Sequence, residues 1–173
     1  VTASRYFPWT GLWMAPFERM GYPYFGHWLA GAISCVFFHR SLLRLLPFSW
    51  ALAGGLMIAV SPGLAVFSNL LLAHHPTMLA LSVFLWAFLR LMHLPSVGNS
   101  LLVGTALTLA MLGRPMTAAG FALPFGVWLF ARFFRTMFLE QSPGWTNIVS
   151  LRILLAIGLP LVVGGLVLGV INR

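Results

Sequence analysis

Two histidines and an arginine are the residues of this chain best suited to bind or transfer charge. His74 and His75 stand side by side within a long apolar run, directly before Pro76. Arg114 follows another apolar run and precedes Pro115. An arginine close to hydrocarbon costs at least about 2.5–3.5 kcal/mol, so it should reach water, a carbonyl or an anionic ligand. We interpret His74 and His75 as a wet helix-initiating turn, with a donor pair for a phosphate as the alternative. For Arg114, a side chain that reaches a lipid headgroup and one that binds an anionic ligand stay equally open.

The elements that position these residues are those of a membrane protein. Of the 173 residues, 60% are hydrophobic and only 7% are charged, whereas soluble proteins average about a quarter. The formal charge of +8 arises without any lysine, from arginines that stand between apolar runs. This placement is typical of membrane helix ends. We therefore expect membrane lipid or phosphates as partners, and no nucleic acid.

The stretch between Arg44 and Arg90 predicts a helical hairpin. It contains no charged residue, and as one helix it would be about twice the ~30 Å hydrocarbon thickness of a bilayer. The chain must therefore turn back on itself. His74 and His75 form its most polar cluster, and the following Pro76 is tolerated only in the first turn of a helix. These residues mark the predicted turn.

The other apolar runs complete an all-α, polytopic transmembrane helix bundle. About six membrane-spanning helices are predicted within residues 24–171. They cover residues 24–46, 50–70, 77–92, 101–113, 116–134 and 153–171. Small residues on the first helix suit close packing, and Pro62 should kink the second. The fourth is too short to span unless it begins in the predicted loop at 95–100.

Residues 1–23 predict an outer interfacial loop, because they are rich in aromatic residues and proline. A short helix over 11–20 should place Trp13, Met14 and Phe17 against lipid. The opening resembles no signal peptide, and the chain ends abruptly after an apolar run. We interpret residues 1–173 as a single transmembrane domain from a longer protein.

Alternating crossings divide the arginines between two membrane faces. One face holds Arg40, Arg44, Arg90, Arg132, Arg135 and Arg152, and the other holds Arg5, Arg19, Arg114 and Arg173. By the positive-inside rule the first face is cytoplasmic. The His74 turn and Arg114 are therefore expected together at the outer face.

Acidic groups are scarce. The chain has no Asp, no glycine-rich phosphate loop, no Ser/His/Asp set and no cysteine pair. We interpret Glu18 as a partner of Arg19 or Arg5, with a role as a base as the alternative. Glu140, on the predicted cytoplasmic face, is interpreted as a solvated loop charge. No metal is expected at the adjacent histidines, because such pairs seldom both reach one ion and Glu18 is the only carboxylate on their face.

Several short segments follow one another in a fixed order along residues 4–135. They are RYFPWTG, a helix ending in HR…R, SPGLAVFSN, the turn HHPT, a helix ending in LR, and GTALTLAMLGRPMTAAGFALPFGVWLFARFFR. This order resembles bacterial glycosyltransferases of the C superfamily, the protein mannosyltransferase-like group related to family 39. LGRP at 112–115 is similar to their T-[KR]-x-P motif after an apolar helix. RYFP at 5–8 is similar to the K-Y-P-P stretch of their first outer loop.

The resemblance implies a transferase in the bacterial inner membrane that takes a sugar from a polyprenyl-phosphate carrier at the outer face. In such enzymes an acidic residue of the first outer loop activates the acceptor hydroxyl, and basic residues stabilise the departing lipid phosphate. It implies Arg114 and Arg5 as phosphate contacts, with His74, His75 and Tyr6 as further candidates. No certain cofactor follows, and a divalent metal in the full-length enzyme is left open.

The chain departs from the family pattern because the acidic motif is missing and would lie upstream of Val1. We therefore expect residues 1–173 to be inactive alone, with Glu18 as the candidate base if they are not. Two other classes stay open: a transporter or channel segment, for which broken helices are also typical, and a structural membrane subunit. The lack of intramembrane acids that could couple ions argues against the transporter.

Overall fold

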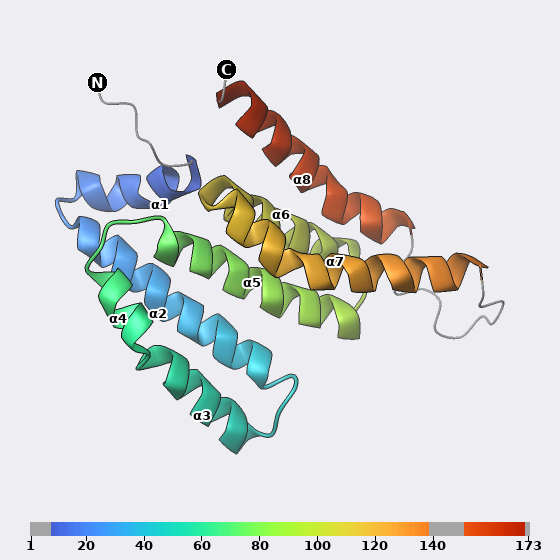
Figure 1. Ribbon diagram of the computed structural model, residues 1–173, viewed down its shortest axis with the longest axis horizontal. Coiled ribbons are helices and arrows are strands. Elements are labelled where there is room, and N and C mark those ends of the chain that lie inside the picture. The colour runs from blue at the N-terminus through green and yellow to red at the C-terminus, as the bar shows by residue number, and fades with distance from the viewer. Residues whose placement is uncertain (1–7, 139–150, 172–173) are drawn as a thin grey trace.

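The computed structural model describes residues 8–138 and 151–171, which form eight α-helices and no β-strand (Figure 1). The helices are α1 (Pro8–Arg19), α2 (Pro23–Leu42), α3 (Phe48–Ala59), α4 (Pro62–Ser68), α5 (His74–His93), α6 (Val97–Gly113), α7 (Pro115–Phe138) and α8 (Leu151–Ile171). The all-α prediction is confirmed for these residues. Arg5, Tyr6, Glu140 and Arg173 lie outside them.

Fewer helices than predicted are able to span a membrane. Among the described residues, three are long and apolar enough: α5, α7 and α8. α3 and α4, bent by 42° at a break, count as a fourth if the pair is one span. The prediction of about six was too high because α2 carries polar residues such as His27, His39 and Arg40, and because α6 has only 17 residues.

Serine side chains set two helix starts. Ser96 Oγ accepts a hydrogen bond from the Asn99 amide at 3.2 Å, so α6 begins at Val97, inside the stretch that we predicted as a loop. Ser61 Oγ accepts one from the Leu64 amide at 3.3 Å and caps α4 in the same way. The predicted kink at Pro62 is thus a full break between α3 and α4.

His74 and His75 are helical, which corrects the predicted turn. They are the first two residues of α5, and the chain reverses earlier, over residues 69–73. Pro76 is the third residue of the helix, where a backbone N–H has no helical partner and its absence costs little. The proline therefore favours a helix start two residues before it.

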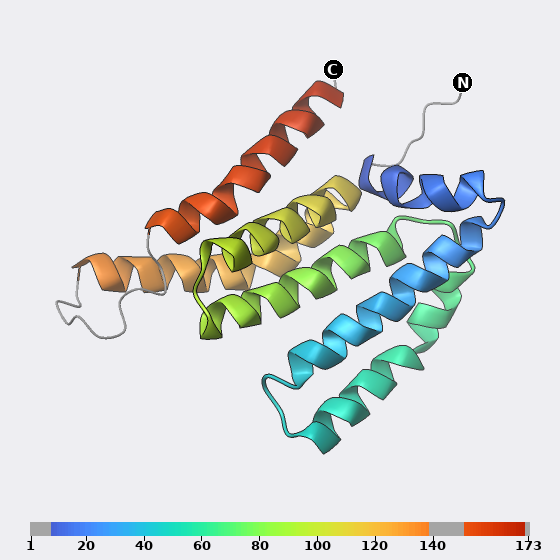
Figure 2. The same cartoon turned by 180° about the vertical axis from the view of Figure 1, so that it is seen from behind.

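α5 is the central helix, between α2 and α6 (Figure 2). In its span 61% of residues are buried, against 6% in that of α7 and 17% in that of α8. The main core joins α5, α6 and α8 through Phe84, Ala87, Phe88, Leu91, Val103, Ala106, Ile153 and Ile157. The exposed apolar side chains of α7 and α8 are those expected of helices in contact with lipid.

The small residues of α2 pack closely against other helices, as predicted. Gly26, Ala30, Gly31 and Ser34 are all buried. A Cβ added at Gly31 would lie 3.4 Å from Cδ2 of His75, so a larger residue would press on that ring. The small face of α2 therefore decides how closely the histidine end of α5 is packed.

α1 packs against protein, which corrects the expectation of an apolar face on lipid. Met14 is 5% exposed, and the Trp13 indole donates a hydrogen bond to the Gly26 carbonyl at 2.9 Å. Glu18 and Arg19 are exposed, as expected for the polar end of this helix. The aromatic residues of α1 thus attach it to α2.

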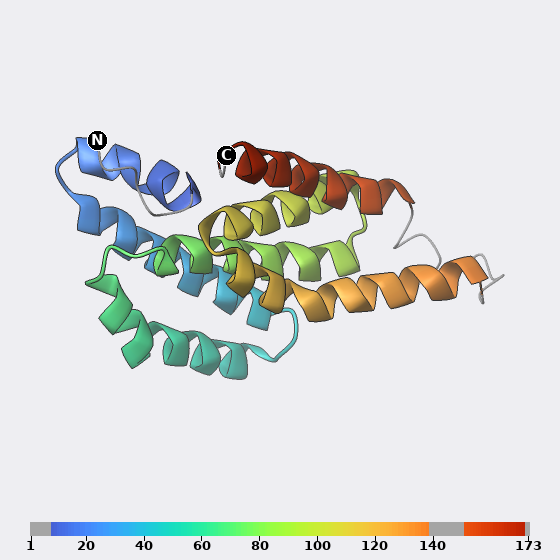
Figure 3. The same cartoon turned by 45° about the horizontal axis from the view of Figure 1, so that its top comes forward.

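The helices run up and down, so the two ends of the bundle differ (Figures 1 and 3). One end gathers α1, the starts of α2, α5 and α7 and the end of α6, and with them His74 and Arg114. The other end gathers the ends of α2, α5 and α7 and the starts of α3, α6 and α8. Arg44 and Arg90 belong to that second end.

We expect these two ends to lie on opposite faces of the membrane. In a Cys35→Ala background, Asn69→Cys and Leu45→Cys should be labelled from opposite sides by a membrane-impermeant maleimide, since both positions are exposed in loops at different ends. Labelling of both from the same side of sealed vesicles would contradict the topology.

A close approach of backbones joins α8 to α6, and it generates a second prediction. A Cβ added at Gly104 would lie 3.0 Å from the carbonyl carbon of Ile157. Gly104→Ala should therefore lower the free energy of unfolding by about 1–3 kcal/mol. Gly126→Ala is the matched control, because nothing lies within 4 Å of its added Cβ and alanine favours a helix by about 0.5–1 kcal/mol. The free energies of unfolding are measured for both variants in the same detergent, and equal values would refute the close contact.

Candidate functional site

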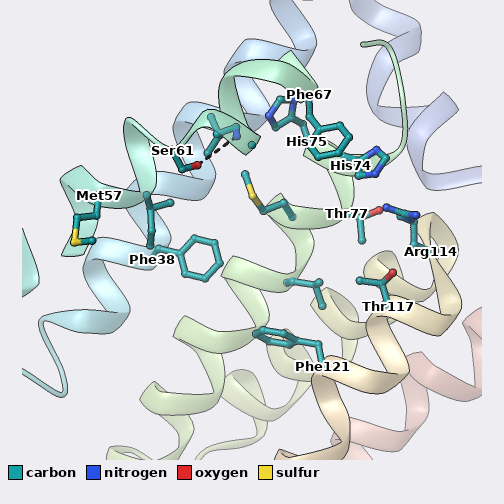
Figure 4. Close-up of a pocket in the computed structure, with 15 residues that line it drawn as sticks. Phe38, Met57, Ser61, Phe67, His74, His75, Thr77, Arg114, Thr117 and Phe121 are labelled. Carbon is teal, nitrogen blue, oxygen red and sulfur yellow. Dashed lines mark hydrogen bonds between the residues drawn. The ribbon is translucent and has the colours of Figure 1, made fainter. Parts of the chain in front are cut away.

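A cavity of about 440 Å³ lies at the bundle end that carries His74 and Arg114 (Figure 4). Fifteen residues from α2, α3, α4, α5, α7, the α3–α4 break and the α6–α7 junction line it. Six of them are polar: Ser61, His74, His75, Thr77, Arg114 and Thr117. Such a volume is within the usual range of small-molecule sites, about 300–1,000 Å³.

Most of the polar lining residues lie toward one side of the cavity. In Figure 4, Thr77, Arg114 and Thr117 lie near His74, whereas Phe38 and Met57 lie on the far side of the cavity. A ligand that fits this wall has a polar head and an apolar body.

Two buried polar atoms at the polar side have no hydrogen-bond partner, and they are Nδ1 of His74 and Oγ1 of Thr77. Buried polar groups are almost always hydrogen-bonded, and each unsatisfied one costs about 1–3 kcal/mol. Because a neutral imidazole has one donor and one acceptor nitrogen, the missing partner should both accept and donate hydrogen bonds.

Ring contacts orient the two histidines. His74 stacks on Phe67 of α4, with ring centroids 4.0 Å apart and planes at 13°. His75 meets His27 of α2 edge to face, with centroids 5.0 Å apart, and is only 2% exposed. The first histidine thus faces α4, and the second is enclosed between α5 and α2.

Residues of α1 and α6 hold the rest of the first turn of α5. The Trp9 indole donates a hydrogen bond to the Pro76 carbonyl at 2.8 Å. A Cβ added at Gly113 would lie 3.2 Å from Cδ1 of Trp9 and would also collide with Thr77, so only glycine lets α6 end here. α1 and the end of α6 therefore fix the position of Thr77.

Arg114 stands at the junction of two helices. Its amide donates the last hydrogen bond of α6, to the Ala110 carbonyl at 2.8 Å, and Pro115 opens α7. Its side chain is half-buried and is the only charged one among the lining residues. The cavity therefore has one fixed positive charge and, among its described lining, no carboxylate to offset it.

The structure brings together three of the residues proposed from the sequence: His74, His75 and Arg114 line one cavity. Arg5 and Tyr6 lie outside the described residues, so their role stays a prediction. Glu18 is exposed on α1 and does not line the cavity. Its pairing with Arg19 or Arg5 also stays a prediction. Within residues 8–138 and 151–171 no group of three or more His, Cys, Asp or Glu side chains could hold a metal ion.

Sequence reasoning missed three contributors: Thr77, Phe67 and His27. Thr77 directly follows the histidine–proline motif, and that adjacency could have pointed to it. Phe67 and His27 carry no local signal, since each is one aromatic ring within an apolar helix whose partner comes from another part of the chain. Only the packing of α2, α4 and α5 reveals them.

The described residues thus form an all-helical fold with three or four helices able to span a membrane and a largely apolar, cationic pocket at one end of the bundle. Comparison with known proteins found no matching family model, no similar curated protein and no similar solved structure. Its function is therefore inferred from the pocket and from the sequence resemblance.

The hydrogen bond from Trp9 of α1 to Pro76 of α5 tethers the two helices, and it generates a third prediction. Trp9→Phe keeps an aromatic side chain but replaces the indole by a smaller ring and removes the hydrogen bond to Pro76, so the free energy of unfolding should fall by at least about 0.5–1.5 kcal/mol. Trp50→Phe, at a position that is 69% exposed, is the control and should change it little. Thermal unfolding in one detergent measures both, and a Trp9→Phe variant as stable as the control would argue against the tether.

Proposed function

We propose that this chain is part of a membrane glycosyltransferase that moves a sugar from a polyprenyl-phosphate carrier to an acceptor at the outer face of the bacterial inner membrane. The pocket would bind the phosphate and sugar of the carrier. The observation that carries the proposal is the meeting of Arg114 with His74 and Thr77, each with an unsatisfied polar atom, at one side of a largely apolar cavity. The order of sequence motifs supports the reaction class.

The proposed donor matches the wall group by group. A phosphodiester takes two parallel hydrogen bonds from the Arg114 guanidinium, the geometry that arginine forms best. Sugar hydroxyls both donate and accept, which suits the free atoms of His74 and Thr77. The first isoprene units of the carrier fit the apolar side, near Phe38 and Met57.

In the transfer step the charge of the departing lipid phosphate rises, and Arg114 stabilises it better in the transition state than in the ground state. The His74 and His75 side chains orient the phosphate and the sugar. The described lining contains no carboxylate, so the acceptor hydroxyl is activated by a base that comes from another part of the enzyme. This division agrees with the acidic first loop that the resemblance implies.

The phosphate role of Arg114 is tested by two substitutions in the full-length enzyme. Arg114→Gln should cost about 1.5–3 kcal/mol of donor or transition-state binding, the usual size of a hydrogen bond to a charged group. Arg114→Lys keeps the charge but loses the two-pronged contact, so it should fall between Gln and the wild type. The measurement is sugar transfer from a polyprenyl-phosphate donor at matched membrane expression.

Arg90→Gln is the matched control, because Arg90 lies over the Trp86 ring in the last turn of α5, at the opposite end of the bundle. Wild-type activity of Arg114→Gln would refute the phosphate role. An equal loss in both variants would indicate a general effect of positive charge instead of a contact in the pocket.

A further inference from the structure

We propose that Met14, His27 and His75 form a buried site for one soft monovalent metal ion, Cu(I), between α1, α2 and α5. The site is distinct from the polar side of the cavity, because the His75 ring lies away from Arg114 (Figure 4). The ion would bind whether or not the cavity takes a sugar donor.

The three side chains come from three helices, and all of them are buried. His27 is 0% exposed, His75 2% and Met14 5%. Sδ of Met14 lies 3.5 Å from Nδ1 of His27. The His27 and His75 rings meet edge to face, with centroids 5.0 Å apart. His27 is therefore in contact with both of the other donors.

The distance between sulfur and nitrogen suits two ligands of one ion. With bond lengths of about 2.0 Å to imidazole nitrogen and about 2.3 Å to sulfur, an ion in line between the two atoms would need about 4.3 Å. The observed 3.5 Å between Met14 and His27 corresponds to a bent arrangement. A bent pair leaves one side of the ion open, and the neighbouring His75 ring can supply the third donor.

Backbone groups can hold the second nitrogen of each imidazole ring. The His27 ring interacts with the backbone of Leu70 and Leu72, and the His75 ring with that of Leu64. Metal-binding histidines usually donate their other N–H to a carbonyl, which leaves the remaining nitrogen as a lone-pair donor. In that tautomer Nδ1 of His27 and the thioether sulfur face each other with lone pairs, and a cation between them removes the repulsion.

The donor set selects a soft ion of low charge. A thioether with two imidazoles suits Cu(I), whereas carboxylates and water suit harder ions. The three side chains carry no negative charge that could offset that of the metal. Because the cost of burying an ion rises with the square of its charge, a divalent ion pays about four times as much as a monovalent one.

Packing alone accounts for only part of this cluster. A methionine against an aromatic ring is a favourable contact in any core. A phenylalanine at position 27 would make the same contact without the cost of burying two polar nitrogens. The imidazoles are therefore better explained by a ligand that uses them.

An ion can reach the cluster from the cavity. His75 is one of the lining residues, and the cavity is open to the surface beside Met57, which is 72% exposed. Thr10 lies one turn before Met14 on the buried face of α1 and is 6% exposed. Its Oγ1 has no hydrogen-bond partner within the described part of the chain, so it can bond a water that accompanies the ion.

The test is Cu(I) binding by the full chain in detergent, under anaerobic reducing conditions and against a chromogenic Cu(I) chelator. A Cys35→Ala background removes the one thiol of the sequence. We expect one ion per chain, with one sulfur and two nitrogen neighbours in its X-ray absorption spectrum. Met14→Leu nearly conserves the side-chain volume, and it should lower the affinity at least about tenfold and remove the sulfur signal.

Two controls separate the cluster from other donors. Met20→Leu should leave the affinity unchanged, because Met20 directly follows α1 and is 58% exposed. His93→Gln should do the same, since His93 is an exposed histidine at the other end of the bundle. Equal affinities of Met14→Leu and Met20→Leu, a copper spectrum without sulfur, or loss of binding in His93→Gln alone would overturn the site.

A second measurement separates metal binding from packing. Cu(I) should raise the midpoint of thermal unfolding of the parent protein and of Met20→Leu but not of Met14→Leu, because an ion that binds only the folded state stabilises it. A midpoint of the parent protein that does not respond to Cu(I) would show that Met14 only packs. Zn(II) bound as tightly as Cu(I) would contradict a soft monovalent site. None of these readouts uses sugar transfer, so they stand apart from the proposed function.

Discussion

The first turn of α5 must be polar and yet buried, and most of the arrangement around it follows from that constraint. His75 and Thr77 are each 2% exposed, so every neighbour has to come close to them. α2 does so with a glycine at position 31, and α6 ends on another at Gly113. α1 then covers the turn and bonds to the Pro76 carbonyl. Small residues at these contacts are the condition for enclosing a polar turn in an apolar bundle.

Sequence reasoning predicted the helices well and the contacts between them poorly. Apolar runs, Pro62 and the prolines after His75 and Arg114 are local signals, and the helix ends lie close to them. The predicted number of spanning helices was too high because α2 includes His39 and Arg40 and because α6 has only 17 residues. The prediction that α1 lies against lipid was wrong because aromatic residues pack equally well against lipid or protein. Met14 of α1 contacts the His27 ring of α2 instead.

The site was predictable in its charges but not in its shape. Arg114 and the histidine pair stand out in a chain with so few polar groups, and alternation of helices placed them at one end. Their meeting in one cavity also needed Phe67, which comes from a helix that exists only because Ser61 and Pro62 interrupt the run. A break that weakens a spanning helix is thus also what supplies one wall of the pocket.

Two explanations that need no ligand could account for the polar residues of the cavity. A snorkelling arginine sends its charge to water, and this account suits a half-buried Arg114 on its own. A wet helix-initiating turn similarly suits His74. Neither explains Thr77, which is closed off from solvent and whose Oγ1 still has no partner. Stability alone would favour an apolar side chain there, because an unpaired buried polar group is destabilising whereas an apolar one of similar shape is not. A polar atom kept unsatisfied on the wall of a cationic cavity is better explained by a partner that arrives with the ligand.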